Sequence, residues 1–253
     1  MKTRARQPRS LRPRSLRLAA PAAVLSALLL VSACGGDDSD PDPDPTPSET
    51  AEDEETGLSK GDLEDALLTE DDVADLASDI EEVEVNEGEI TGDDIVDGDE
   101  ACAAFLDDDY GIEEEEKAET EFESEADQIS VYSTIESYAE GEAAEELEAT
   151  RDLFSECSTF TVDLDGQAVT VDVLTIDISD LDGYDLGDEG LAVDLTFSVE
   201  GAEVLRQGYT LVRIDDVLTI SGAATVGDLG DDIMLTITEA AVDRLQTVLD
   251  DAA

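Results

Sequence analysis

The three cysteines of this sequence are the residues best suited to covalent chemistry, and no histidine accompanies them. They stand at Cys34, Cys102 and Cys157 of a chain of 253 residues. Ser-His-Asp and Cys-His nucleophilic sites need an imidazole base, and His-ligated zinc sites need imidazole ligands, so these classes are excluded. The 69 acidic residues are too numerous for any carboxylate pair to stand out as catalytic. We therefore predict a protein that is not an enzyme, with no catalytic residue, no metal site and no cofactor.

Cys34 follows a segment typical of an export signal. Residues 1–17 contain one lysine and six arginines with no acid, and the next sixteen residues are almost entirely apolar or small, which is too short for a spanning helix of about 20 residues. Val31-Ser32-Ala33-Cys34 resembles the bacterial lipobox, in which the thiol receives a diacylglyceryl group and becomes the first residue after cleavage. Two acyl chains, such as palmitate, give stable anchoring. The alternative is an ordinary signal peptide with an incidental cysteine.

The charge of the expected mature chain is extreme. Residues 1–33 hold seven of the 13 basic residues, so six basic residues remain against 69 acidic ones, a net charge of −63. Phosphate binding requires Lys and Arg, so we predict no nucleic-acid partner. The charge is compatible with a basic partner, with cations, or with adaptation of the protein to a salty medium.

Salt is expected to stabilise the folded chain, because at about 1 M the screening length falls to about 3 Å and repulsion among the carboxylates is weakened. The measurement is the melting temperature from low to molar NaCl. A melting temperature that stays constant or falls with salt would refute this expectation.

Composition divides the chain into three parts. After the signal peptide, 1–33, residues 34–60 hold the lipidated cysteine and a segment rich in Asp, Pro, Ser and Glu with almost nothing to bury, which is typical of a disordered tether. At about 3.3 Å per residue, this tether could extend roughly 80 Å. Residues 61–253 are expected to form one domain on the outer side of the cell membrane.

The helices of this domain are predicted from capping residues and from apolar spacings of three and four. Thr69 is a suitable N-cap for a short acidic helix. Ala143, Leu147 and Phe154 place one apolar stripe on a longer helix. The expected helices are 70–76, 101–106, 141–157 and a C-terminal helix that begins between Asp231 and Thr238.

The strands are predicted from alternation and from turn residues. A short strand is expected near 80–85, and two short strands joined by a turn at Asp127 lie within 121–138. After residue 157, closely spaced alternating runs form a hairpin-linked meander, with a bulge where the apolar phase slips near residues 174–178. We predict an α+β fold: one twisted antiparallel sheet of about five or six strands, with helices packed on one face.

Cys102 and Cys157 are the only thiols left once Cys34 is acylated. An even pair in an exported chain favours a disulfide. The alternative is two buried thiols.

The order of these features resembles the PknH-like extracellular sensor domains of actinobacteria, which occur on receptor kinases and as free-standing lipoproteins. The matching parts are Leu67 to Asp72, the strand at Val131 to Ser133 that leads into an Ala-rich helix, and Cys157 at the end of that helix. The resemblance implies a mixed α/β domain with a cleft that binds a small ligand or wall component. Kinase-linked members have two disulfides, whereas this chain can form one.

Two functions follow as expectations. The first is a lipid-anchored, sensor-like domain that binds a ligand, for which the ligand-binding residues are unknown. The second is a non-catalytic interaction or structural lipoprotein of the cell envelope, whose acidic surface meets a basic partner. Five tyrosines are candidates for lining a cleft, although each also fits ordinary packing: Tyr110, Tyr132, Tyr138, Tyr184 and Tyr209.

Cation binding is a third expectation to weigh. Calcium requires six to eight oxygen ligands, and the segment after Asp180 has the composition of a calcium loop. Its glycine stands at the fourth position rather than the sixth, so the EF-hand pattern fails.

Overall fold

The computed structural model describes residues 58–85, 90–107, 110–164, 166–180, 186–227 and 229–252. Of Asp180 and Asp231 it describes the backbone alone. Cys34, the expected signal peptide and most of the expected tether therefore lie outside the described residues. The first described helix begins at Lys60, near the expected start of the domain.

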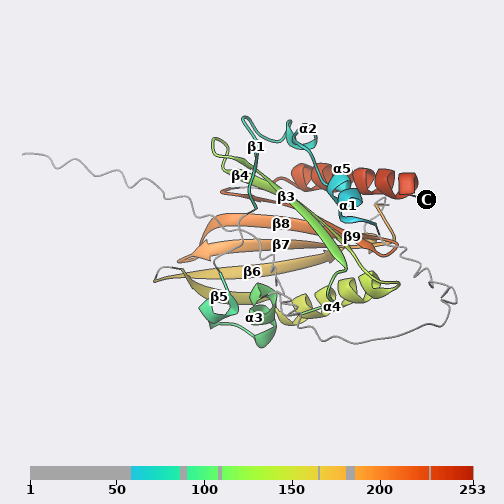
Figure 1. The fold of residues 1–253 in the computed structure, drawn as a ribbon. Helices are drawn as coiled ribbons and strands as arrows, with labels where there is room; N and C mark the ends of the chain where they lie inside the picture. Colours follow the sequence, from blue (N-terminus) through green and yellow to red (C-terminus); the bar gives the residue numbers. More distant parts are fainter. Residues whose placement is uncertain are drawn as a thin grey trace, which may run out of the picture.

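Within the described residues, nine antiparallel strands form one sheet, in the order β1-β3-β4-β9-β8-β7-β6-β5-β2 (Figure 1). The five strands from β5 to β9 follow one another in sequence and in space, so the predicted meander is confirmed. The β3–β4 hairpin joins the meander through β4, which pairs with β9. The strands are β1 Glu81–Val83, β2 Ile95–Asp97, β3 Glu116–Ser124, β4 Ile129–Ser137, β5 Thr159–Leu164, β6 Gln167–Asp177, β7 Glu189–Val199, β8 Ala202–Ile214 and β9 Val217–Thr225.

The expectation of five or six strands was too low, while the α+β class is confirmed. The short strand expected near residues 80–85 is present as β1, whereas β2 was not expected; each has three residues and lies at one edge of the sheet. A segment of three residues is too short to show a period of two clearly, so alternation identifies such an edge strand poorly.

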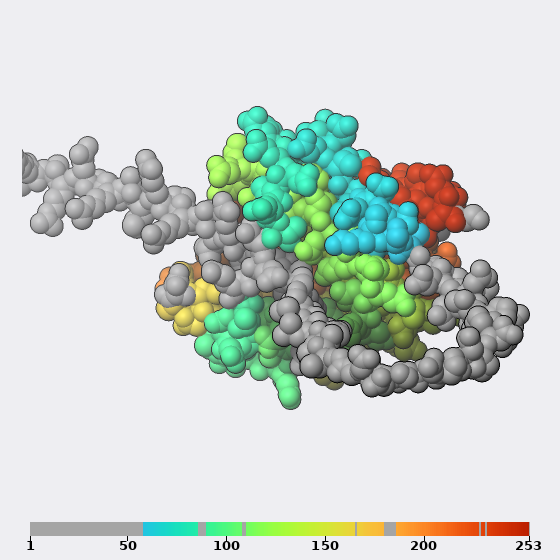
Figure 2. Space-filling view, viewed as in Figure 1, coloured from blue at the N-terminus to red at the C-terminus, as the bar shows by residue number. Residues whose placement is uncertain are grey.

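Helices cover both faces of the sheet, so the expectation of helices on one face was wrong (Figure 1). The first face carries α1 Lys60–Ala66, α2 Glu70–Val73 and α5 Asp231–Ala252, and the second carries α3 Glu100–Asp107 and α4 Glu142–Glu156. Figure 2 shows α1 and the adjoining segment (cyan) against α5 (red).

The pattern of the central strands explains this two-sided covering. In β8, Leu211 packs into the core with α4, whereas its neighbour Val212 packs into the core with Val242 of α5. A strand that is buried on both faces loses the alternation of apolar and polar residues, and that loss is the sequence signal for two helical layers.

The bulge expected in β6 is absent, because β6 pairs with β7 in continuous register from Thr170 to Asp177. The change in the alternation of apolar and polar residues near residues 174–178 has another cause. Leu174 and Ile176 lie on the first face, in a part that α5 does not reach, and they are 59% and 45% exposed. The irregularity in the meander lies instead between Phe197 and Ser198 of β7.

Local capping defines the starts of the N-terminal helices. At the predicted N-cap position, the Asp72 carboxylate accepts hydrogen bonds from the backbone N–H and the hydroxyl of Thr69. Asp62 accepts the same two bonds from Ser59 at the start of α1, a helix that was not predicted. A capping pair of this kind stabilises the start of a helix, because it satisfies backbone N–H groups that have no partner within the helix.

Candidate functional site

A row of residues across the second face of the sheet brings together tyrosines that are far apart in sequence. Tyr132 of β4 lies opposite Gly222 of β9, and Gly222 lies opposite Tyr209 of β8. Tyr110, in the segment that precedes β3, packs against the same hydrophobic core that contains Tyr209. We call Tyr110, Tyr132 and Tyr209 the tyrosine cluster.

Gly222 provides the space in which the Tyr132 ring lies. A Cβ at this position would overlap the ring Cζ and the hydroxyl of Tyr132. The ring therefore lies over the backbone of β9, and its hydroxyl accepts a hydrogen bond from the Gln207 amide at 3.2 Å. Because Gly222 of β9 has no side chain, Tyr132 of β4 can reach the side chain of Gln207 of β8.

The tyrosine hydroxyls of this row are neutral at physiological pH. Burial raises the pKa of Tyr132 well above its ordinary value, and the hydrogen bond from Gln207 offsets only part of that effect. Burial also raises the pKa of Tyr209, and the neighbouring Tyr110 and Tyr132 raise it further. Neutral phenols can both donate and accept hydrogen bonds.

Gly222→Ala is expected to displace the Tyr132 ring and to lower the free energy of unfolding by about 1–3 kcal/mol, the usual cost of overpacking. The matched control is Gly230→Ala, because a Cβ at Gly230 meets nothing within 4 Å. The control should change stability by less than about 0.5 kcal/mol. The measurements are urea unfolding and near-ultraviolet circular dichroism, in which no tryptophan obscures the tyrosine signal. Equal behaviour of the two variants would contradict the described position of Tyr132.

A buried ion pair lies on the same face, near the start of β3 and the end of β4. Lys117 Nζ is 3.2 Å from Glu136 Oε1, and the Tyr138 hydroxyl donates to Glu136 Oε2 at 2.8 Å. Burial raises the pKa of Glu136, and Lys117 and Tyr138 lower it only in part. Burial lowers the pKa of Lys117, but nearby carboxylates, Glu136 foremost, leave it above the ordinary lysine value.

A second buried carboxylate, Glu146 of α4, holds the segment before β3. Its Oε2 accepts the backbone N–H of Ile112 at 2.5 Å, and its side chain occupies the space that a Cβ of Gly111 would need. Gly111 has a φ of +77°, a conformation that residues with a side chain rarely adopt. Burial raises the pKa of the Tyr138 hydroxyl, and the negative charges of Glu136 and Glu146 raise it further.

Three of the five candidate tyrosines therefore come together, and two do not. Tyr138 is nine-tenths buried and is bonded to Glu136, as in ordinary packing, and Tyr184 lies outside the described residues. Sequence reasoning missed Gln207, Gly222 and the Lys117–Glu136 pair. A lone lysine within the acidic run before and within β3 was the one available signal.

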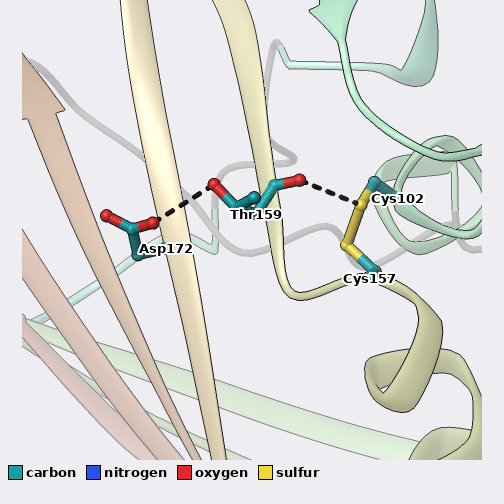
Figure 3. Close-up of a disulfide and its surroundings, with 4 residues drawn as sticks. All are labelled: Cys102, Cys157, Thr159 and Asp172. Carbon is teal, nitrogen blue, oxygen red and sulfur yellow. Dashed lines mark hydrogen bonds between the residues drawn. A yellow bond between two sulfur atoms is a disulfide. The ribbon is translucent and has the colours of Figure 1, made fainter.

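The disulfide expected from the sequence is present between Cys102 of α3 and Cys157 at the end of α4 (Figure 3). Both residues are fully buried, and their Cα atoms are 5.0 Å apart. Cys102 Sγ also approaches the carbonyl oxygen of Thr159 at 3.9 Å. The bond thus joins the two helices of the second face, where Phe105 and Phe154 also pack edge to face at 5.1 Å.

Most basic side chains of the domain are engaged by carboxylates within it. Six Lys and Arg residues lie within residues 58–252, and five of them form ion pairs. The pairs are Lys117–Glu136, Arg151–Glu189, Arg206–Asp194, Arg213–Asp188 and Arg244–Asp72. The outer surface consequently offers few cations for binding phosphate, and its exposed charge is overwhelmingly negative.

Within the described residues, no group of three or more Asp, Glu, Cys or His side chains is arranged to hold a metal ion. Part of the calcium-loop-like segment, residues 181–185, lies outside that portion of the chain. Among the helices that the structure describes, none is long and apolar enough to cross a membrane.

Comparison with known proteins identifies the fold alone. No family model matches the chain, and no curated protein matches it. The fold is similar to that in a crystal structure of the extracellular domain of PknH from Mycobacterium tuberculosis, with a TM-score of 0.53 and 13% sequence identity. The match covers 75% of this chain and 97% of that one. This chain thus has the fold of a PknH-like extracellular sensor domain, as the order of its sequence features predicted.

Proposed function

We propose that this protein is a lipoprotein anchored on the outer side of the cell membrane, whose sensor-like domain binds a small polar molecule beside the tyrosine cluster. The observation that carries the proposal is the convergence of Tyr110, Tyr132 and Tyr209 on one face of a fold similar to an extracellular sensor domain. Nothing in this arrangement points to a reaction, so we propose binding without catalysis.

The chemistry of the row defines the class of ligand. The neutral hydroxyl of Tyr132 and the Gln207 amide form hydrogen bonds, and aromatic rings attract cations through their faces. Carboxylates are abundant on the same face, where Glu121 of β3 lies opposite Tyr132. Anions are therefore disfavoured, and an uncharged or cationic molecule fits best.

Native mass spectrometry of the expected mature chain, residues 34–253 with Cys34→Ser, tests the ligand. We expect a reproducible extra mass that disappears on denaturation and that is reduced in Tyr132→Phe, which lacks the hydroxyl bonded to Gln207. Thr170→Val is the matched control, because it removes a strand hydroxyl from the opposite face of the sheet. An extra mass of equal abundance in both variants would place the ligand elsewhere, and a mass equal to that of the protein alone would contradict binding.

The anchor is tested separately, at Cys34. When the full chain is produced in a bacterium that acylates lipoproteins, we expect it in the detergent-soluble membrane fraction, with the mass of a chain that starts at residue 34 and carries acyl groups. Cys34→Ala should abolish both the acylation and the membrane fractionation. An unacylated, secreted wild-type chain would support the ordinary signal peptide instead.

The charge distribution favours a second candidate function, binding of a basic partner in the cell envelope. Five of the six basic side chains in the domain are engaged internally, so the exposed carboxylates face outward largely without counter-charges. A lysine-rich peptide should then bind the domain at low salt and dissociate near 1 M NaCl, where the screening length is about 3 Å. A glutamate-rich peptide of equal length is the control. Failure of the lysine-rich peptide to bind at low salt would dispose of this candidate.

A further inference from the structure

The second half of β6 has a neighbouring strand on one side alone. β5 pairs with β6 as far as Asp172, and the last backbone bond on that side runs from the Val173 N–H to the Ser158 carbonyl at 2.9 Å. β6 itself continues to Asp177, and there it is paired with β7 on its other side. Within the described residues, no strand pairs with the β5 side of residues 174–177. We call residues 173–177 the open edge of β6.

The backbone of Thr175 points toward this open edge. In an antiparallel ladder, the N–H and C=O groups of successive residues point to opposite sides of the strand. The Val173 N–H points toward β5, so the N–H and C=O of Thr175, two residues further on, point the same way. Those of Leu174 and Ile176 point toward β7. Thr175 therefore presents a donor and an acceptor to an added strand, as in peptide binding by strand addition.

The side chains of the same stretch are apolar and exposed on the first face. Leu174 and Ile176 are 59% and 45% exposed, and both belong to the open edge. Natural sheets usually blunt an unpaired edge with charge or proline, because an apolar edge favours association with another chain. A strand added beside β6 would bring its own first-face side chains to within about 5 Å of these two and would cover them.

Carboxylates border the open edge on the second face. Arg151 of α4 lies 3.5 Å from Asp177 and 3.0 Å from Glu189, so the flank of α4 that bears Arg151 faces the end of β6. Glu148 and Asp152 lie on the same flank, at helical spacings of three and four, and both are exposed. The guanidinium is already paired, so the second-face side chains of an added strand would meet negative charge.

We propose that the open edge of β6 binds an extended peptide of a partner protein in which apolar residues alternate with Lys or Arg. The peptide adds to the sheet as a strand. Its apolar side chains cover Leu174 and Ile176 on the first face, and its basic side chains lie toward Glu148 and Asp152 on the second. The inference rests on the second candidate function, binding of a basic partner, and gives that partner a position and a sequence pattern.

Charge argues against the occupants that the chain itself could supply. A second copy would bring a further large excess of carboxylates to an edge that carboxylates already border. The expected tether, 34–60, is rich in Asp, Glu and Pro, and its one basic residue is Lys60. Proline cannot donate a ladder hydrogen bond, so such a segment is a poor strand. A basic partner is the occupant whose charge complements the edge.

A short synthetic peptide of alternating Leu and Lys tests the proposal. It is titrated at low salt into residues 34–253 with Cys34→Ser, and calorimetry gives the dissociation constant. Hydrogen exchange measured by NMR reports where the peptide binds. We expect the Thr175 amide to become protected on binding, because strand addition gives its N–H a partner.

Two variants and one control locate the binding. Leu174→Ser/Ile176→Ser should weaken binding at least about tenfold, since covering one large apolar side chain corresponds to a factor of this size. Thr175→Pro should abolish binding, because proline removes the outward N–H and leaves the ladder with β7 intact. Val96→Ser/Val226→Ser removes two other exposed apolar side chains and should leave the affinity unchanged.

Two isomeric peptides distinguish strand addition from attraction by charge alone. One is N-methylated on its lysine amides, and the other on its leucine amides. Alternate amides of a strand face the same neighbour, so one isomer should bind and the other should not. Equal affinity of the two isomers would overturn the proposal.

The remaining outcomes separate this inference from the second candidate function. Undiminished affinity in Leu174→Ser/Ile176→Ser and in Thr175→Pro, or no binding of the alternating peptide at low salt, would overturn the inference. The lysine-rich peptide would still decide the candidate function. Dimerisation without peptide that is lost in Leu174→Ser/Ile176→Ser would identify a second copy as the occupant, and would also overturn the inference. If Thr175→Pro does not fold, the surface variant and the isomeric peptides decide the test.

Discussion

Loss of the Cys102–Cys157 disulfide is expected to lower the free energy of unfolding by about 4 kcal/mol. The bond closes a loop over a sequence separation of 55 residues, and chain entropy assigns a stabilisation of this size to such a loop. Without the bond, the contact of α3 with α4 depends on apolar packing such as that of Phe105 against Phe154. The measurement is urea unfolding of the oxidised wild type and of Cys102→Ala/Cys157→Ala, both with Cys34→Ser.

A reduced wild-type chain serves as the control for the cavity that alanine leaves. Both sulfurs are fully buried, so the protein must be reduced in denaturant and refolded with the thiols kept reduced. The reduced chain and the double alanine variant should then have similar stability. A loss of less than about 1 kcal/mol in both would show that this bond contributes far less than chain entropy predicts.

Lys117→Met is expected to lower the free energy of unfolding by about 3–5 kcal/mol at neutral pH, because it leaves the buried Glu136 carboxylate without its cation. The loss should shrink as pH falls, since Glu136 can then be protonated and needs no counter-charge. Thermal or urea unfolding across this pH range measures both effects. Lys60→Met is the matched control, because Lys60 is exposed at the start of α1.

The double variant Lys117→Met/Glu136→Gln distinguishes the cost of an unpaired buried carboxylate from the cost of lost packing around the Lys117 side chain. Removing both charges leaves no uncompensated carboxylate, so stability should recover substantially from that of Lys117→Met alone. A double variant no more stable than Lys117→Met would mean that packing around the lysine chain, and not the ion pair, carries the effect.

Much of the local structure could be predicted from the sequence, because its signals lie within a few residues of one another. The stripe of Ala143, Leu147 and Phe154 has the period of a helix, and these residues lie on α4, Glu142–Glu156. The cap at Thr69 likewise depends on Asp72, three residues away. Such signals act over one or two helical turns, so they do not depend on how the helices and strands are arranged in the tertiary structure.

The errors arose where neighbours far apart in sequence decide the outcome. The apolar Leu174 and Ile176 predicted a bulge, but they are exposed on a part of the sheet that no described helix covers. The placing of helices on both faces likewise depends on which strands lie beside one another. β4 pairs with β9 rather than with the next strand along the chain, and no local pattern encodes that choice.

The candidate site belongs almost entirely to the tertiary structure. Tyr132 and Tyr209 are 77 residues apart in sequence and meet across Gly222 only because β4, β9 and β8 are adjacent. The sequence by itself determined the acidic charge, the absence of histidine chemistry, the main helices, the meander and the cysteine pair. Composition, period and covalent pairing are properties of single residues or short windows. The strand order, the two helical layers, the tyrosine cluster and the Lys117–Glu136 pair required the fold, because each depends on burial and on long-range contacts that arise only when the whole sheet assembles.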